Sequence, residues 1–167
     1  SPLSKRALAP AIMKEFGEGG WIGITLPEDR GGQQMPHLIG DCCNLIFSAA
    51  NYSATAYALL SSGAAHLIES FAGRDLFETY VPNIIEGKWQ GTMALTEPDA
   101  GSSLADTVTQ AEPTKHGYYH IQGQKIFISA GDHDAVENVV HMMLARIPDA
   151  PPGVKGISLF IVPQKRI

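Results

Sequence analysis

MALTEPDAGSS, residues 93–103, and GQKIFISAG, residues 123–131, are the two stretches that most strongly narrow what this chain can be. In the first, an apolar run ends at Thr96 and gives way to a loop that contains a proline and Gly101. Proline fixes its own φ, and glycine takes dihedrals that other residues avoid. Such a loop can therefore turn backbone N–H groups and the Ser102 hydroxyl toward an anion.

The second stretch places an aromatic, a β-branched and a hydroxyl residue one after another. If residues 125–128 form an extended strand, Phe127 and Ser129 point to one face and Ile128 points to the other. That face offers a planar ring a surface for stacking and a hydrogen-bond donor. A flat ligand that carries phosphate groups, such as a flavin, would use both stretches as two walls of one site. The alternative is a β-turn followed by an ordinary strand.

The two stretches together resemble the acyl-CoA dehydrogenase family, whose members carry a TEP-x-AG-S loop and a K-[aromatic]-I-[Ser/Thr] strand in a middle β-domain. The resemblance extends upstream to GEGGWIGITLPEDRGG, residues 17–32, and to residues 82–93, which are similar to the family's entry to the β-domain. Phe127 and Ser129 stand where relatives often have Trp and Thr, which keeps the aromatic face and the hydroxyl. Ser103 stands where many relatives have Asp.

What the resemblance implies first is FAD as the cofactor. The main chain of the first stretch and the Thr96 hydroxyl would meet the isoalloxazine edge, and Gly101 and Ser102 would lie near the pyrophosphate. Ser102 is also the implied contact to the CoA thioester substrate. The complete set of residues implied to bind the cofactor is Met93, Leu95, Thr96, Gly101, Ser102, Phe127, Ile128 and Ser129.

The implied reaction is α,β-dehydrogenation of an acyl-CoA thioester to the trans-2-enoyl-CoA, with a hydride passed to FAD N5. The family's base is a glutamate in a C-terminal helical bundle, which we expect outside this chain, so no catalytic residue is assigned. Electron-transfer flavoprotein is the implied acceptor, and a homodimer or homotetramer is the implied full-length assembly. The branch with the greatest similarity acts on long-chain or 3-methylmercaptopropionyl thioesters. An acyl-CoA oxidase, or a protective or nucleic-acid-associated flavin-binding module of the same fold, remains the alternative.

The spacing of the apolar residues changes once along the chain and predicts an α+β fold. Before about residue 88 the spacing is helical, with Leu8, Ile12 and Phe16 four residues apart and a helix that can open at Pro36. A further helix over residues 75–86 is expected to end at Gly87. Short strands are predicted over residues 107–111, 118–121, 125–128, 139–147 and 157–162. We therefore expect an all-α domain over residues 1–90 and an incomplete antiparallel β-domain over residues 91–167.

Composition and charge exclude several classes of partner. The formal net charge is −5, whereas binding to nucleic acid requires a basic surface. No nucleic-acid partner is therefore expected. Residues 42–68 carry no formal charge, yet their polar side chains argue against a membrane span and for two buried helices that break near residues 51–53. Cys42 and Cys43 suggest a reducing compartment and hence a cytoplasmic location.

Several other residues invite functional interpretations that we set aside. Asp132, His133 and Asp134 are adjacent and fit a solvated turn better than a metal site, with a role beside the flavin as the second interpretation. Glu97 is expected to form an ion pair or to brace the loop rather than to act as a base. Trp21, Trp89, His66 and His141 are expected to be structural residues.

Overall fold

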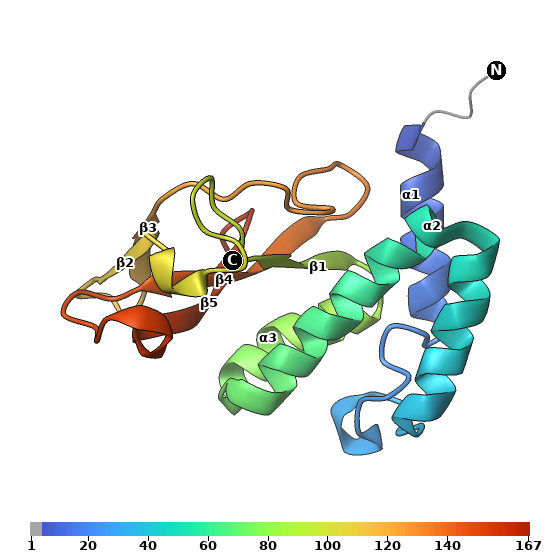
Figure 1. Ribbon diagram of the computed structural model, residues 1–167. Helices are drawn as coiled ribbons and strands as arrows, with labels where there is room; N and C mark the ends of the chain where they lie inside the picture. The colour runs from blue at the N-terminus through green and yellow to red at the C-terminus, as the bar shows by residue number, and fades with distance from the viewer. Residues whose placement is uncertain (1–4) are drawn as a thin grey trace.

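The computed structural model describes residues 5–167, and the side chains of residues 9–167, so Leu8 lies outside the described side chains. Three helices come first: α1 (Lys5–Glu18), α2 (His37–Phe71) and α3 (Arg74–Ile85). Five strands follow: β1 (Trp89–Ala94), β2 (Gln110–Pro113), β3 (Tyr119–Gln122), β4 (Asn138–Arg146) and β5 (Ile157–Pro163). The helices gather at one end of the molecule and the sheet at the other (Figure 1), which confirms the α+β prediction.

The helix α2 is interrupted at the predicted place. Asn51 has non-helical dihedrals (φ −161°, ψ 95°), and its side-chain Oδ1 accepts a hydrogen bond from Ala54 N at 3.1 Å, which begins the second half. The second half is buried against the rest of the chain, whereas Leu38, Leu45 and Ile46 of the first half are about 70% exposed. The prediction of two buried helices is therefore correct for the second half alone. Among the described residues, no helix is both long and apolar enough to cross a membrane.

The sheet is mixed, so the expectation of a purely antiparallel domain is wrong. The strands β1 and β4 are parallel neighbours, with Trp89 beside Asn138 and Ala94 beside Met143. A parallel pair needs a crossover connection, and here the chain passes through the loop after β1 and the β2–β3 hairpin before β4 begins. The pairs β2–β3 and β4–β5 are antiparallel, and β2 meets β4 in parallel at Gln110 and Arg146.

Two of the predicted strands differ from the structure. Residues 125–128 form no strand, because Phe127 has a left-handed backbone (φ 57°) that cannot continue a pleated ladder. The strand predicted over residues 107–111 begins only at Gln110; the short 3₁₀ helix η2 (Leu104–Asp106) precedes it, and Val108 N and Thr109 N donate to the Glu97 side chain. The other three predicted strands are present within one or two residues of their expected ends.

The core lies between the second half of α2, α3 and the strands β1 and β4. Small residues allow a close approach there, because a Cβ added at Gly91 of β1 would lie 2.5 Å from the Ala64 Cβ of α2. Ser61 Oγ accepts hydrogen bonds from Gly91 N at 3.1 Å and from Gln90 Nε2 at 3.0 Å, which fixes β1 against the helix. Trp89 is a core residue as expected, whereas Trp21 is 38% exposed and packs edge-on against Phe47.

We expect substitution of Gly91 to separate the helix from the sheet. Gly91→Ala introduces a methyl group where Ala64 leaves no room and should lower the free energy of unfolding by about 1–3 kcal/mol. Gly63→Ala is the matched control, because a Cβ at this exposed helical position meets nothing within 4 Å and should stabilise the protein by up to about 1 kcal/mol. Urea unfolding measures both, and equal effects would contradict the close contact.

Candidate functional site

The structure brings the two decisive stretches together at the end of β1. Ile126 N donates a hydrogen bond to Thr96 O at 2.9 Å, and Lys125 Nζ donates to Leu95 O at 3.0 Å. Segments that are some thirty residues apart in the sequence therefore lie side by side. This is the arrangement that a shared binding site requires.

A buried ion pair holds the two stretches. Lys125 Nζ lies 2.7 Å from Glu97 Oε1, and the two side chains are only 6% and 1% exposed. The other Glu97 oxygen accepts a hydrogen bond from Val108 N at 2.8 Å, and Oε1 also accepts from Thr109 N at 3.2 Å and from the Thr109 hydroxyl at 2.5 Å. Glu97 thus forms an ion pair and braces the loop, as expected.

The protonation state of Glu97 follows from these contacts. Burial by itself would raise the pKa of the carboxyl group, but the hydrogen bonds from Lys125, Thr109 and the Val108 backbone outweigh it and lower the pKa to about 2. The carboxylate therefore stays ionised near neutral pH, and its acceptor positions are already occupied. A general base needs a pKa near the working pH and a free path to its proton, so Glu97 does not suit that role.

The loop after β1 is folded back on itself. Glu97 N donates to Ala100 O at 2.7 Å, and Ala100 N donates to Glu97 O at 3.3 Å, which closes a tight turn. A Cβ added at Gly101 would lie 3.7 Å from the Thr96 methyl group, so Gly101 packs beside Thr96. Ser102, which follows, is exposed. Three of the predicted cofactor residues therefore lie at the same edge of the sheet.

Phe127 is the clearest sign of a binding role in the second stretch. The side chain is 89% exposed, and the backbone has φ 57°, a conformation that costs a bulky residue about 1–2 kcal/mol. A strained and exposed aromatic residue indicates a functional constraint, because neither feature stabilises the fold. Ser129 is also exposed and Ile128 is partly buried, but the segment is no strand, so the shared face expected for Phe127 and Ser129 stays a prediction.

Ile128 lines a cavity of about 330 Å³ on the inner side of this segment. The other lining residues are Ala94, Lys125, Gly131, Asp132, His141 and Met143. His141 Nδ1 lies 2.7 Å from the Thr92 hydroxyl, and His66 Nε2 lies 2.7 Å from the Thr25 hydroxyl, so both histidines are hydrogen-bonded as expected. Burial lowers the pKa of each of these two imidazoles.

Met93 is the predicted cofactor residue that the structure places least favourably. Its side chain is partly buried and packs against the core cluster, so only its main chain can face the loop edge. Leu95 is also partly buried, and its carbonyl oxygen already accepts the hydrogen bond from Lys125. The side chains best placed to meet a ligand are therefore those of Ser102, Phe127 and Ser129.

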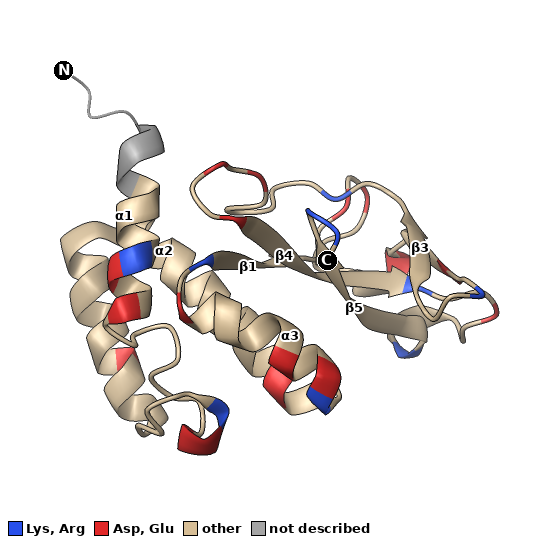
Figure 2. Ribbon diagram, turned by 180° about the vertical axis from the view of Figure 1, so that it is seen from behind, with Lys and Arg blue, Asp and Glu red and all other residues tan. Residues whose placement is uncertain are grey.

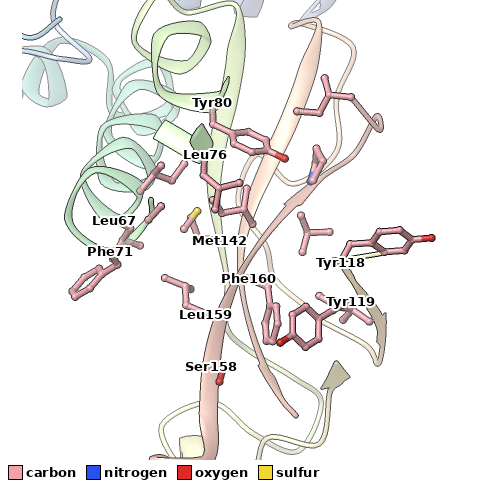
Figure 3. A pocket seen from close by; sticks show the side chains of 18 of the residues that line it. Leu67, Phe71, Leu76, Tyr80, Tyr118, Tyr119, Met142, Ser158, Leu159 and Phe160 are labelled. Carbon is pink, nitrogen blue, oxygen red and sulfur yellow. The ribbon is translucent and has the colours of Figure 1, made fainter. Parts of the chain in front are cut away.

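A second, more voluminous groove lies elsewhere and contains none of the predicted site residues. It is an apolar groove of about 860 Å³ between the helices α2 and α3 and the strands β3, β4 and β5. Aromatic side chains of Tyr118, Tyr119 and Phe160 line one wall, and Phe71 and Leu76 lie on the helical side (Figure 3). No motif in the sequence pointed to this groove, because its walls come from five elements that extend from α2 to β5.

The segment Asp132-His133-Asp134 is an irregular bend, as expected for a turn. Asp132 Oδ1 accepts a hydrogen bond from Gln164 Nε2 at 2.7 Å, and the His133 ring packs edge-on against Tyr57. Burial lowers the pKa of His133, although the two neighbouring aspartates act in the opposite direction. Within residues 9–167, no group of three or more His, Cys, Asp or Glu side chains is arranged to hold a metal ion.

Lys125 is the residue that the sequence argument missed. The first stretch contains the acidic residues Glu97 and Asp99, so a lysine among the apolar residues of the second stretch was the available signal for an ion pair. Thr109 was also missed, because a threonine in a predicted strand gives no sign that its hydroxyl will meet a buried carboxylate.

The protein is an α+β protein with a helical layer, a mixed sheet and a candidate cofactor site at the end of β1. Comparisons with known proteins identify its family. The family model described as "Acyl-CoA dehydrogenase, N-terminal domain" matches residues 4–88, and "Acyl-CoA dehydrogenase, middle domain" matches residues 92–166. The chain therefore belongs to the acyl-CoA dehydrogenase family. This confirms the resemblance drawn from the two motifs.

Individual relatives agree with the family. A 3-methylmercaptopropionyl-CoA dehydrogenase of Ruegeria pomeroyi is 43% identical over 90% of this chain and 26% of its own length. The broad-specificity linear acyl-CoA dehydrogenase FadE5 of Mycobacterium tuberculosis is 36% identical over 88% of this chain and 24% of its own length. An acyl-CoA dehydrogenase of Bacillus anthracis solved with FAD superimposes with a TM-score of 0.79 at 25% identity, over 95% of this chain and 26% of that one. The chain thus spans about a quarter of the length of these relatives.

We expect Lys125→Met to destabilise the protein strongly. The substitution leaves the Glu97 carboxylate buried without its cation, which typically costs about 3–5 kcal/mol. The double variant Glu97→Gln with Lys125→Met removes both charges and should be more stable than the single variant. Lys14→Met is the control, because the Lys14–Glu18 pair is exposed and should contribute less than about 1 kcal/mol. Chemical denaturation measures all three, and a small effect of Lys125→Met would contradict the role of the pair.

The low pKa of Glu97 also predicts a pH dependence. Because the folded pKa is about 2 and the ordinary value is 4.5, the carboxylate contributes stability that is fully present above about pH 4.5 and is lost as the pH falls toward 2. We expect the free energy of unfolding of the wild type to decrease over this interval. The Glu97→Gln, Lys125→Met double variant should show a shallower decrease, and equal slopes in denaturation curves from pH 5 to pH 2 would refute the assignment.

Proposed function

We propose that this chain is the FAD-binding part of an acyl-CoA dehydrogenase that converts an acyl-CoA thioester to the trans-2-enoyl-CoA. The observation that carries the proposal is the buried Lys125–Glu97 pair, because it holds the TEP loop and the KIFIS segment in register at one edge of the sheet. Family membership supports the same conclusion, as do relatives whose names specify dehydrogenation of acyl-CoA substrates.

The residues at this edge fit a flavin. Phe127 presents an exposed ring and Ser129 is also exposed, while the buried ion pair holds the preceding Lys125 in place. We assign the stacking contact to Phe127 and the hydrogen bond to the ring edge to Ser129 and Thr96. The main chain at Met93, Leu95 and Ile128 completes this wall. Gly101 and Ser102 are assigned to the pyrophosphate, since the turn leaves them open to an anion.

The protein's contribution to the reaction is alignment. When bound, FAD supplies the hydride acceptor for the β-carbon of the substrate. We assign Ser102 to the thioester ligand and the removal of the α-proton to a glutamate outside these 167 residues. Holding the substrate in register against the cofactor is worth several kcal/mol of the barrier. None of the residues of this chain is assigned a catalytic role.

The wider setting belongs to the same proposal. We assign residues 1–90 to an N-terminal helical domain and residues 91–167 to part of the middle β-domain. The proposed electron acceptor is electron-transfer flavoprotein. The proposed assembly of the full-length enzyme is a homodimer or homotetramer. Long-chain or 3-methylmercaptopropionyl thioesters are the proposed substrates, and the cytoplasm is the proposed location. Lysine and arginine residues of the described part lie scattered among acidic residues (Figure 2), which supports a partner other than nucleic acid.

Two substitutions test the flavin wall. Ser129→Ala removes one neutral hydrogen bond and should weaken FAD binding by about 1 kcal/mol, or roughly fivefold. Phe127→Ala removes the stacking surface and should weaken binding by about 0.5–1.5 kcal/mol, with little change in stability because the side chain is 89% exposed. Phe71→Ala is the control, because this phenylalanine is 79% exposed and lies at the end of α2. Flavin absorbance titration measures each affinity, and unchanged binding in both variants would refute the assignment.

The placement of the base gives a separate prediction. Because the catalytic glutamate is assigned to a residue outside these 167, we expect this chain with FAD to show no dehydrogenation of acyl-CoA substrates. The measurement is flavin bleaching under anaerobic conditions with excess substrate, and readmission of oxygen then separates an oxidase from a dehydrogenase in the full-length enzyme. Robust bleaching by the 167-residue chain would place the base inside it.

A further inference from the structure

Arg146, the last residue of β4, gathers backbone carbonyl groups from two loops. Nε donates to Thr107 O at 2.8 Å and Nη2 donates to Ala105 O at 2.7 Å, both in the segment that follows Ser102. Nη2 also donates to Gly153 O at 2.9 Å, and Nη1 donates to Pro151 O at 3.4 Å, in the loop between β4 and β5. One guanidinium group therefore joins residues 102–109 to residues 151–156.

The topology of the sheet explains why these two loops meet. Because β1 and β4 are parallel, the loops that follow them leave from the same end of the sheet, at the carboxyl ends of the two strands. The loop after β1 includes Ser102 and η2, and the loop after β4 includes the 3₁₀ helix η3 (Gly153–Gly156). Arg146 lies at the point where β4 ends between them. The parallel pairing that the sequence did not predict is thus the reason for the contact.

The second loop is shaped around the guanidinium. A Cβ added at Gly156 would lie 2.8 Å from Arg146 Nη1 and 1.9 Å from Pro151 O, so a side chain at this position would displace the loop. Gly153 has φ 73°, a conformation that glycine adopts without strain. Within residues 9–167, no carboxylate lies within ion-pair distance of Arg146, so its hydrogen bonds go to carbonyl groups.

The segment after Ser102 is also held from its other side. Glu97 accepts hydrogen bonds from Val108 N and Thr109 N, and Arg146 N donates to Thr109 O at 2.8 Å. Ser102 itself is exposed and lies between two fixed points, the Glu97–Ala100 turn and the Ala105 carbonyl group. Its position therefore depends on Arg146 at one end and on the buried ion pair at the other.

We propose that Arg146 is a positioning residue that fastens residues 102–109 to residues 151–156 and so holds Ser102 in place for a phosphate-bearing ligand. The assignment of that ligand rests on the proposed function. The planar fork of arginine is needed because a lysine ammonium cannot reach carbonyl groups on both loops with the same geometry. The two loops then form one wall at the mouth of the candidate cofactor site, and they loosen together when the fork is lost.

Hydrogen exchange on the 167-residue chain without ligand tests the fastening. Arg146→Lys keeps the charge but removes the fork, and should raise amide exchange roughly tenfold in both residues 102–109 and residues 151–156, with β5 unchanged. Lys155→Gln is the control, because this exposed cation lies in the same loop and should exchange like the wild type. Faster exchange in one loop alone, or wild-type exchange in Arg146→Lys, would overturn the proposal.

A double-mutant cycle on FAD affinity tests the effect on Ser102. If Arg146 acts by placing Ser102, Arg146→Lys should weaken FAD binding roughly tenfold, and adding Ser102→Ala should change it little further. Fully additive effects would overturn the positioning role. If Arg146→Lys raises amide exchange in both loops but the wild-type chain binds no FAD, the proposed function is overturned and the fastening by Arg146 is not. The failure of the proposed function and the failure of this proposal are therefore distinguishable.

Discussion

The buried ion pair between Lys125 and Glu97 is the constraint on which the rest of the site depends. Two charges removed from water cost several kcal/mol unless their remaining hydrogen-bonding positions are filled. Here the carboxylate also accepts from Val108 N, Thr109 N and the Thr109 hydroxyl, and the ammonium group also donates to Leu95 O. The pair therefore fixes three segments at once: the TEP turn, the strand entry at β2 and the segment before Phe127.

This buried polar layer explains how the exposed residues above it keep their positions. Phe127 and Ser129 have no packing of their own, and Phe127 even has an unfavourable backbone conformation. Such a conformation persists only when the surrounding structure holds it in place. Here the hydrogen bond from Ile126 N to Thr96 O and the buried ion pair hold the segment. The parallel pairing of β1 and β4 also matters, because the loops that follow these two strands leave from the same end of the sheet.

The helical layer serves the site indirectly. The second half of α2 packs on β1 through Gly91 and Ala64 and through the hydrogen bonds of Ser61, so the end of β1 has a fixed position in the molecule. The apolar groove between the helices and β5 is a separate feature, and none of the predicted cofactor residues lines it. The motifs and the ion pair point to the end of β1 instead of this groove.

The sequence by itself determined the family, the change from helices to strands, the break near Asn51 and the two stretches that meet. These follow from local spacing and from motifs, which are properties of neighbouring residues. Only the tertiary structure decided that β1 and β4 are parallel, that Phe127 is left-handed rather than part of a strand, and that Lys125 and Arg146 hold the loops. The physical reason is that each of these depends on partners distant along the chain, and a charge in a sequence does not reveal which buried group will satisfy it.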